Sequence, residues 1–187
     1  MGVSFLTLAP EHPLVAKITT PEQKDQVNQY VEKAALKNER DRQVQSKEMS
    51  GVFTGAFAIH PFTQKQVPIY IGDYVLAGYG TGAVMAVPAG DQRDWDFAKH
   101  HNIPMVLIFE NHDAAEGACT SKEVPLVNSE FLNGLCGPMA FDTIITELEK
   151  IEYGNRKVNY RLRDAVFSRQ RYWGEPFPVY FKEGMAT

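Results

Sequence analysis

The chain has 187 residues, of which 44% are hydrophobic and 22% charged, with a formal net charge of −4. This length and composition are typical of one globular domain with a genuine core, and they exclude a disordered chain. No apolar run approaches the roughly 20 residues of a membrane span, and no basic region precedes the first apolar stretch, so we expect neither a membrane segment nor a signal peptide. The two cysteines, Cys119 and Cys136, are too few for a disulfide framework, which favours a reducing, cytoplasmic location.

The charge is unevenly distributed along the chain. Residues 1–150 carry a net charge of −7, whereas residues 151–187 carry +3. A broadly basic nucleic-acid binder is therefore excluded, and any contact with nucleic acid is expected in the tail or in a local patch.

The first predicted elements are a strand over residues 3–9 and a helix that begins at Thr20. Thr20 is a good N-cap residue, and proline at position 21 suits the first helical position. The apolar residues that follow at helical spacing predict one buried face; they are Val27, Tyr30, Val31 and Ala34. The charged stretch that follows, KNERDRQVQSKEM, is expected to be a solvated helix end or a loop.

From Ser50 the pattern changes to β. Three runs rich in β-branched and aromatic residues are separated by turn residues, and they predict strands within 51–60, 66–76 and 82–88. Their tight connections suggest a small barrel or a curled sheet. Further along, we predict a helix over 91–101, a strand over 105–109 and an amphipathic helix over 138–153 that Gly154 ends. A domain boundary is expected near Asn155, giving domains 1–155 and 156–187.

The glycine turn at residues 80–82 and the strand after it form the first part of a candidate site. Glycine has no Cβ, so the turn allows a ligand to approach the backbone closely, and Thr81 adds a hydroxyl. On the strand, alternation places Met85 and Val87 on one face with Ala83. These side chains could form an apolar wall against a small side chain of a ligand.

Two carboxylates follow at the start of the next helix. Asp91 and Asp94 are three residues apart and therefore lie on one side of the helix N-terminus. One carboxylate could pair with the α-ammonium of a small apolar amino acid. The alternative is that both residues only cap the helix and that the glycine turn is only a turn.

Other catalytic arrangements find little support. The five histidines are scattered, no residues have metal-ligand spacing, and no Gly-x-Ser-x-Gly elbow is present. We therefore expect no metal and no cofactor bound to this chain itself.

Residues 79–98, YGTGAVMAVPAGDQRDWDFA, resemble the editing-domain pattern YGTGAVMxVPxHDxRDxxFA of leucyl-tRNA synthetases at almost every fixed position. Further similar stretches follow the same order: residues 2–13, TGAFAIHPFT, VPIYIGDYVL, NSEFLNGL and RKVNYRLRDAVFSRQRYWGEPFPV. The resemblance covers nearly the whole chain. It implies an α+β fold with a small β-barrel-like core and flanking helices, and it implies that 156–187 is the segment returning to the aminoacylation core.

The resemblance also implies roles for individual residues. Asp94 matches the aspartate that binds the α-amino group of a misattached amino acid and is the expected catalytic residue. Tyr79, Met85 and Val87 match the lining of the same pocket, while Thr81 and Asp91 shape it. The implied reaction, within a leucine–tRNA ligase, is hydrolysis of the ester between a wrong amino acid, such as norvaline or isoleucine, and the terminal adenosine of tRNA(Leu). ATP and Mg²⁺ would serve the parent enzyme, which is expected to be a monomer.

The sequence departs from the family pattern in several places. Gly90 stands where the family has histidine, which puts one polar contact in doubt. The family's threonine-rich peptide, T-T-R-P-D-T, precedes the residues that match Met1 and Gly2, so we expect half a pocket and a weak or inactive hydrolase. The ATP-site signatures HIGH and KMSKS are also missing, and Ala165-Val166 replaces Trp-Gly.

An alternative function is a non-catalytic tRNA-binding module. Arginines and an aromatic in the basic segment 156–173 could bind phosphates and stack on bases; they are Arg161, Arg163, Arg169, Arg171 and Trp173. The simpler interpretation is that these side chains pair and pack within the parent enzyme. Salt-dependent tRNA binding that survives loss of Asp94 would favour the binding module.

Overall fold

The structure is a computed structural model that describes residues 1–37, 49–78, 80–112, 117–158, 181–182 and 185–186. Contacts divide the chain into two units, Met1–Arg156 and Lys157–Thr187. In the second unit the described residues form an antiparallel pair, β5 (Phe181–Lys182) and β6 (Met185–Ala186). The arginines and Trp173 of the alternative tRNA-binding hypothesis lie outside the described residues. The functional division at 155/156 stays a prediction.

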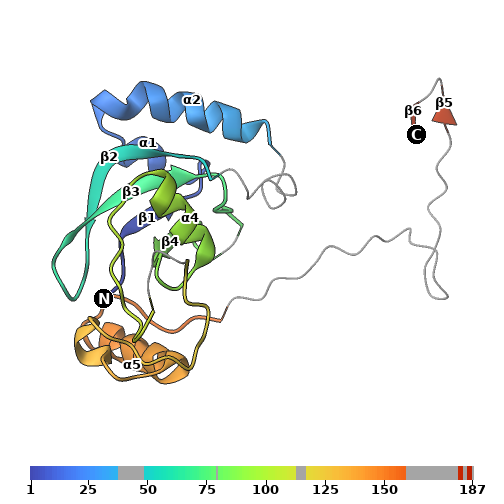
Figure 1. Ribbon diagram of the computed structural model, residues 1–187. Helices are drawn as coiled ribbons and strands as arrows, with labels where there is room; N and C mark the ends of the chain where they lie inside the picture. Colours follow the sequence, from blue (N-terminus) through green and yellow to red (C-terminus); the bar gives the residue numbers. More distant parts are fainter. Residues whose placement is uncertain (38–48, 79, 113–116, 159–180, 183–184, 187) are drawn as a thin grey trace. The chain divides into compact units, whose positions relative to one another are not determined.

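The first unit is built on a four-stranded sheet with the order β2-β3-β1-β4 (Figure 1). β1 runs parallel to β3 and antiparallel to β4, and β2 pairs antiparallel with β3. All four strands lie at predicted positions: β1 (Phe5–Leu8), β2 (Gly51–Ile59), β3 (Gln66–Gly72) and β4 (Ala83–Ala86). The α+β class is confirmed. The barrel-like core is only approximate, because the described strands form an open sheet with β2 and β4 at its edges.

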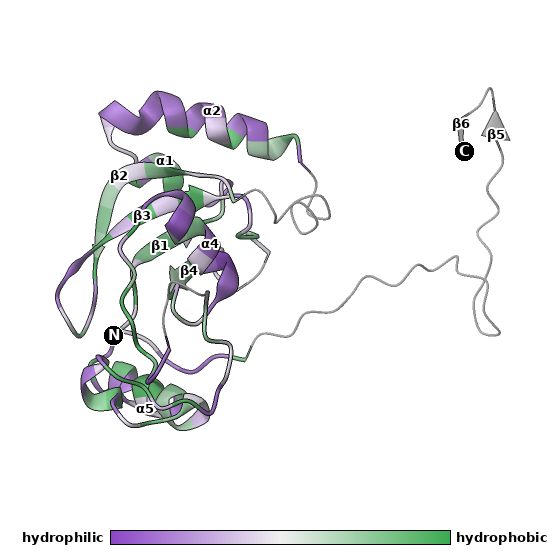
Figure 2. Cartoon of the chain, in the orientation of Figure 1, coloured by the Kyte–Doolittle hydropathy of each residue, from purple (hydrophilic) through white to green (hydrophobic). Residues whose placement is uncertain are grey.

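One face of the sheet packs against two helices. Leu8 of β1 lies opposite Ile71 of β3, and both are buried on the same face. They pack with Val15 of α1 (Val15–Ile18) and Val27 of α2 (Lys24–Ala35). Hydrophilic residues dominate the rest of α2 (Figure 2). The apolar side of the amphipathic pattern predicted from Thr20 onward therefore packs on this face of the sheet.

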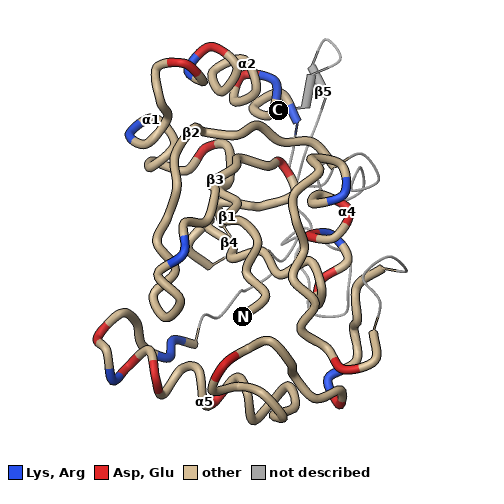
Figure 3. The backbone as a smooth tube through the Cα atoms, turned by 60° about the vertical axis from the view of Figure 1, so that its left-hand side comes forward, with Lys and Arg blue, Asp and Glu red and all other residues tan. Residues whose placement is uncertain are grey.

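The opposite face is covered by α4 (Gln92–His100). Its Phe97 is fully buried and stacks on Phe5 of β1, with ring centroids 4.9 Å apart. Tyr70 of β3 meets both rings edge-on. The strands β1 to β4 contain no charged residue, and charges of both signs lie on helices and connections (Figure 3). The sheet is thus an apolar layer between α4 on one side and α1 with α2 on the other.

Helix ends differ from the sequence predictions in detail. The chain after Thr20 first forms a 3-10 turn, η1 (Pro21–Gln23), and the Thr20 side chain makes no capping hydrogen bond. The four-residue α1 is too short to be seen as a periodic pattern. The predicted helix 138–153 is α5 (Gly137–Lys150), which follows the 3-10 turn η2 (Glu130–Leu132). No helix in the described residues has the length and apolar character needed to cross a membrane.

The strand predicted over residues 105–109 is wrong. Only Phe109 forms a β-bridge, to Leu126, and the rest of the segment is irregular. Pro104 precedes the segment and Pro125 lies in the facing one, and neither can donate a backbone N–H to a ladder. Single bonds therefore replace a ladder, such as that from the Val127 N–H to the Ile108 carbonyl.

A bulge in β2 brings the α2 entry onto the sheet. The pairing of β2 with β3 shifts register between Phe53 and Phe57, and Gly55 within the shift has φ +81°. A Cβ at Gly55 would lie 2.1 Å from the Thr20 hydroxyl oxygen. The Thr20 N–H donates to the Thr54 carbonyl at 2.9 Å. The absent side chain at Gly55 thus allows Thr20 to approach the sheet.

We predict that Gly55→Ala lowers the free energy of unfolding by at least about 2 kcal/mol, because left-handed strain alone costs about 1–2 kcal/mol and the new methyl group collides with Thr20. Gly90→Ala is the matched control, since a Cβ there would make only ordinary contacts, with Phe109 at 3.4 Å and Val87 at 3.9 Å. Its effect should stay within about 1 kcal/mol. Urea denaturation of both variants measures the difference, and equal losses would contradict this account of the bulge.

Candidate functional site

The two carboxylates at the start of α4 have different environments. Asp91 is the N-cap, and its Oδ1 accepts hydrogen bonds from the backbone N–H groups of Arg93 at 2.8 Å and Asp94 at 3.4 Å. The predicted capping role of Asp91 is therefore confirmed. Asp94 is 5% exposed, whereas the Asp91 side chain remains 46% exposed. The shared helix end leaves one carboxylate in contact with water and buries the other.

Asp94 joins the helix to the end of β4. Its Oδ2 accepts the backbone N–H of Val87 at 2.9 Å, and its Oδ1 accepts the Tyr74 hydroxyl at 3.2 Å. The Tyr74 hydroxyl lies 3.0 Å from the Thr7 Oγ1 on β1. A carboxylate has about four lone-pair positions. Two are occupied by Val87 and Tyr74, and two remain for a further donor.

Burial governs the titration of Asp94. Desolvation raises the pKa of Asp94 to about 6, and the charge of Asp91 adds to the rise. The hydrogen bonds from Val87 and Tyr74 and the nearby Arg93 act in the opposite direction. Burial also raises the pKa of Tyr74, so its hydroxyl stays protonated and can donate. Asp94 can consequently change its charge near pH 6.

Val87 is the first residue of the connection from β4 to α4, and its backbone groups hold that connection together. Its carbonyl accepts the N–H groups of Gly90 at 2.9 Å and Asp91 at 3.1 Å, which closes the turn through residues 88–90. A Cβ at Gly90 would be in ordinary contact distance of Phe109. The turn itself therefore does not require glycine at position 90. The Cβ of a larger residue would fit there without a clash.

Two other predicted pocket residues, Met85 and Thr81, lie apart from the Asp94 carboxylate. Met85 of β4 is 54% exposed and lies opposite Leu6 of β1. Its side chain is on the sheet face that α2 covers in part. Thr7 and the Asp94 hydrogen bonds lie on the other face. Thr81 stands before β4, and its hydroxyl bonds only within its own turn, to the Ala83 carbonyl and N–H. Tyr79 lies outside the described residues.

The structure thus brings together Val87, Asp91 and Asp94, and it adds Tyr74 and Thr7. Sequence reasoning did not select these last two. Thr7 carried a usable signal, because a threonine on the buried face of an otherwise apolar strand needs a hydrogen-bond partner. Nothing in the local sequence identifies that partner as Tyr74, 67 residues away.

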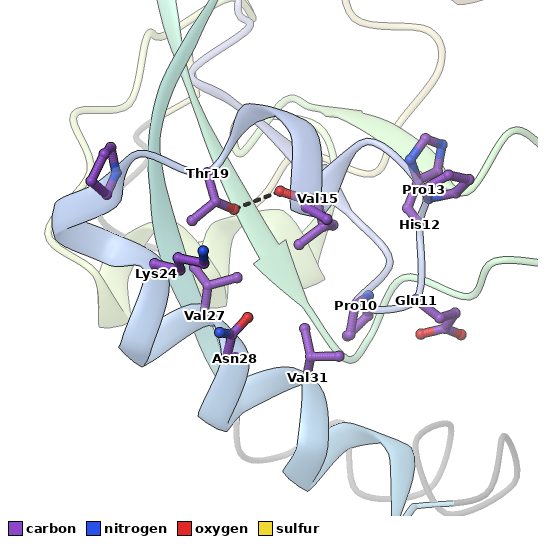
Figure 4. A pocket seen from close by; sticks show the side chains of 12 residues that line it. Pro10, Glu11, His12, Pro13, Val15, Thr19, Lys24, Val27, Asn28 and Val31 are labelled. Carbon is purple, nitrogen blue, oxygen red and sulfur yellow. Dashed lines mark hydrogen bonds between the residues drawn. The ribbon is translucent and has the colours of Figure 1, made fainter.

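Several cavities lined by described residues lie away from the Asp94 carboxylate. One of about 510 Å³ lies between residues 10–13, α1 and α2, with His12, Lys24 and Asn28 among its lining (Figure 4). In it the Thr19 hydroxyl is already bonded to the Val15 carbonyl at 2.6 Å. Within the described part of the chain, no group of three or more histidine, cysteine or acidic residues could hold a metal ion.

Comparison with known proteins gives a consistent result. The family model described as "Leucyl-tRNA synthetase, editing domain" matches residues 1–149. The chain is 60% identical to the leucine–tRNA ligase of Christiangramia forsetii and also 60% identical to that of Flavobacterium johnsoniae. Each alignment covers 98% of this chain but only 19% and 20% of those proteins. The chain therefore spans about a fifth of the length of its curated relatives.

A solved structure is also similar. It is the ternary complex of Agrobacterium radiobacter K84 agnB2 LeuRS with tRNA and LeuAMS, at 32% identity and a TM-score of 0.63. The similarity covers 100% of this chain and 20% of that one.

We predict that Asp94 gives the fold a distinctive pH dependence. Its pKa of about 6 exceeds the ordinary aspartate value of 3.8, so its stabilising contribution is complete below pH 3.8 and is lost as pH rises through 6. Relative to Asp94→Asn, the wild-type chain should lose up to about 3 kcal/mol of unfolding free energy over this window. Urea denaturation of both proteins at several pH values between 4 and 7.5 measures it. Parallel curves would show that Asp94 does not titrate in this range.

Proposed function

Because the chain belongs to the leucyl-tRNA synthetase editing-domain family, we propose that it hydrolyses the ester between a wrong amino acid and tRNA(Leu). The observation that supports this most is the Asp94 carboxylate, which is buried yet keeps two lone pairs without a partner among the described residues. A buried anion of this kind is costly unless a positive group can approach it. The α-ammonium of an aminoacyl ester is such a group.

In this proposal Asp94 anchors the substrate by its ammonium. A charge-assisted bond at a water-poor position is about twice as strong as a neutral one. Tyr79, Met85 and Val87 would contact the amino-acid side chain, while Thr81 and Asp91 would shape the ends of β4 and α4. Norvaline and isoleucine are the wrong amino acids expected in this proposal.

A second, hydrolytic sieve is chemically reasonable for these amino acids. One methylene in an apolar pocket contributes only about 1–3 kcal/mol of discrimination, which is too little for accurate charging. Removal of the wrong ester after it forms raises the accuracy without a better first pocket.

The proposed reaction needs only water as co-reactant. Water attacks the ester carbonyl carbon, the bond from that carbon to the ribose oxygen breaks, and the ribose hydroxyl leaves with a proton. An aminoacyl ester is already activated, so placing the carbonyl and a water in line supplies most of the acceleration. The neighbouring ribose hydroxyl would help to orient that water. In this step the chain contributes position and charge rather than a covalent nucleophile.

The partner in this proposal is the 3′ aminoacyl-adenosine end of tRNA(Leu). The similar Agrobacterium structure contains tRNA, which supports this choice. ATP and Mg²⁺ would act in the aminoacylation reaction of the whole ligase. A monomeric state and a cytoplasmic location also belong to the proposal.

We predict that Asp94→Asn lowers kcat/KM for deacylation of isoleucyl- or norvalyl-tRNA(Leu) about 10- to 100-fold, the effect of losing one charge-assisted bond. Asp96→Asn is the matched control, because Asp96 lies on the same helix and contacts only the Gln92 side chain among described hydrogen bonds. It should change the rate little. Release of labelled amino acid measures both variants.

The assay should use the 187-residue chain and a form that continues upstream through a threonine-rich segment like that of the family. If neither form releases amino acid faster than buffer, the proposed hydrolysis is wrong. If Asp94→Asn and Asp96→Asn behave alike in an active form, hydrolysis stands and the assigned anchor is wrong.

A further inference from the structure

A chain of hydroxyl and carboxyl groups, on buried Thr7, half-buried Tyr74 and buried Asp94, links three parts of the fold. The Thr7 Oγ1 on β1 lies 3.0 Å from the Tyr74 hydroxyl, which donates to the Asp94 Oδ1 at 3.2 Å. Thr7 is fully buried and Asp94 is 5% exposed. Tyr74 comes from the connection between β3 and β4. These groups therefore have few alternative partners, and their hydrogen atoms must be arranged among themselves.

The charge of Asp94 sets the direction of this chain. An ionised carboxylate can only accept, so Tyr74 must donate to Asp94 and Thr7 must donate to the Tyr74 oxygen. A protonated Asp94 can donate instead, and both hydroxyls can then turn the other way. The Val87 N–H donates to Oδ2 in either case. Oδ1 is consequently the oxygen whose bonding changes with the charge.

We propose that Tyr74 is a positioning residue for the Asp94 carboxylate: it occupies one lone pair of Oδ1 and thereby fixes which lone pairs face a substrate ammonium. The role toward a substrate rests on the proposed function above. Asp94 has two fixed partners, one on each oxygen, so its plane cannot rotate without losing one of them. The remaining lone pairs then have a set direction before any ligand arrives.

The Tyr74 ring is itself held in place. Its centroid lies 5.5 Å from that of Phe97 in the core. Gly72 makes room for the ring, since a Cβ there would lie 2.9 Å from a ring carbon of Tyr74 and 3.0 Å from the Thr7 methyl. The hydroxyl is therefore positioned by packing on α4 and on the end of β3.

The charged and titratable groups around Asp94 are few. On α4 they are Asp91 and Arg93, and from the β3–β4 connection Tyr74. β1 contributes only the neutral Thr7. Burial raises the pKa of Asp94, and the Tyr74 hydrogen bond lowers it. Loss of that bond should leave Asp94 protonated to a higher pH and less able to hold an ammonium.

The test is Tyr74→Phe in the full chain, with two readouts. The first is the NMR titration of the Asp94 side-chain carboxyl carbon without tRNA, whose midpoint should rise by roughly one pH unit. The second is the pH profile of kcat/KM for deacylation, whose acid limb should move to higher pH by the same amount. Most of the wild-type rate should return at alkaline pH, after subtraction of uncatalysed hydrolysis.

Two further variants separate positioning from folding. Tyr30→Phe removes another part-buried hydroxyl, which donates to the Ser50 carbonyl at 2.8 Å near the end of α2. It should lower stability but leave the Asp94 midpoint and the acid limb unchanged. Thr7→Val keeps the Tyr74 hydroxyl but removes its support, and it should shift both readouts upward by a smaller amount.

An unchanged Asp94 midpoint in both Tyr74→Phe and Thr7→Val would overturn the proposal, whatever the activity. A shifted midpoint with an unmoved acid limb would also overturn it, because the carboxylate would then not be positioned for the reaction. If the midpoint shifts but the wild-type protein deacylates nothing, the effect of Tyr74 on the carboxyl stands. Its substrate role then fails together with the proposed function.

Discussion

The hydrogen bond from the Val87 N–H to the Asp94 carboxylate is the contact on which the candidate site depends. Val87 is the first residue beyond β4, where the ladder no longer supplies an acceptor for its N–H. A buried N–H without a partner costs about 1–3 kcal/mol. Asp94 meets this need from α4, and the same bond sets where α4 begins relative to the sheet. Phe97, one turn further along α4, then stacks on Phe5. One carboxylate thus ties the end of β4 to α4, whose Phe97 completes the core stacking.

A carboxylate is nonetheless an expensive way to satisfy one N–H and one hydroxyl. Burial raises the pKa of Asp94, so the fold favours its neutral form. An asparagine side chain could accept from Val87 without that cost. In the proposed function, ionised Asp94 gains an advantage when a cation approaches the two lone pairs that have no partner among the described residues. The energetic weakness of Asp94 is therefore the physical argument for a role in binding.

Strand positions and the Asp91 cap were predictable because each depends on neighbours in the sequence. Alternation in β1 and the residue type at a helix N-cap are local signals. The pairing of Thr7 with Tyr74 was not predictable, because it depends on β1 lying parallel beside β3. The strand predicted over 105–109 failed for a related reason. Its apolar composition suited a strand, but Pro125 in the facing segment could not continue a ladder.

Sheet geometry also constrains how the predicted pocket residues can act together. Met85 and the Asp94 hydrogen bonds lie on opposite faces of β4, which is an edge strand of the described sheet. A ligand that touched both would have to pass around β4, either along its open edge or at its end near Val87. There the Val87 side chain lies close to Gly2, whose missing Cβ would come within 3.2 Å of it. The segment before β1 therefore borders the end of β4, which is one route by which a ligand could reach both faces.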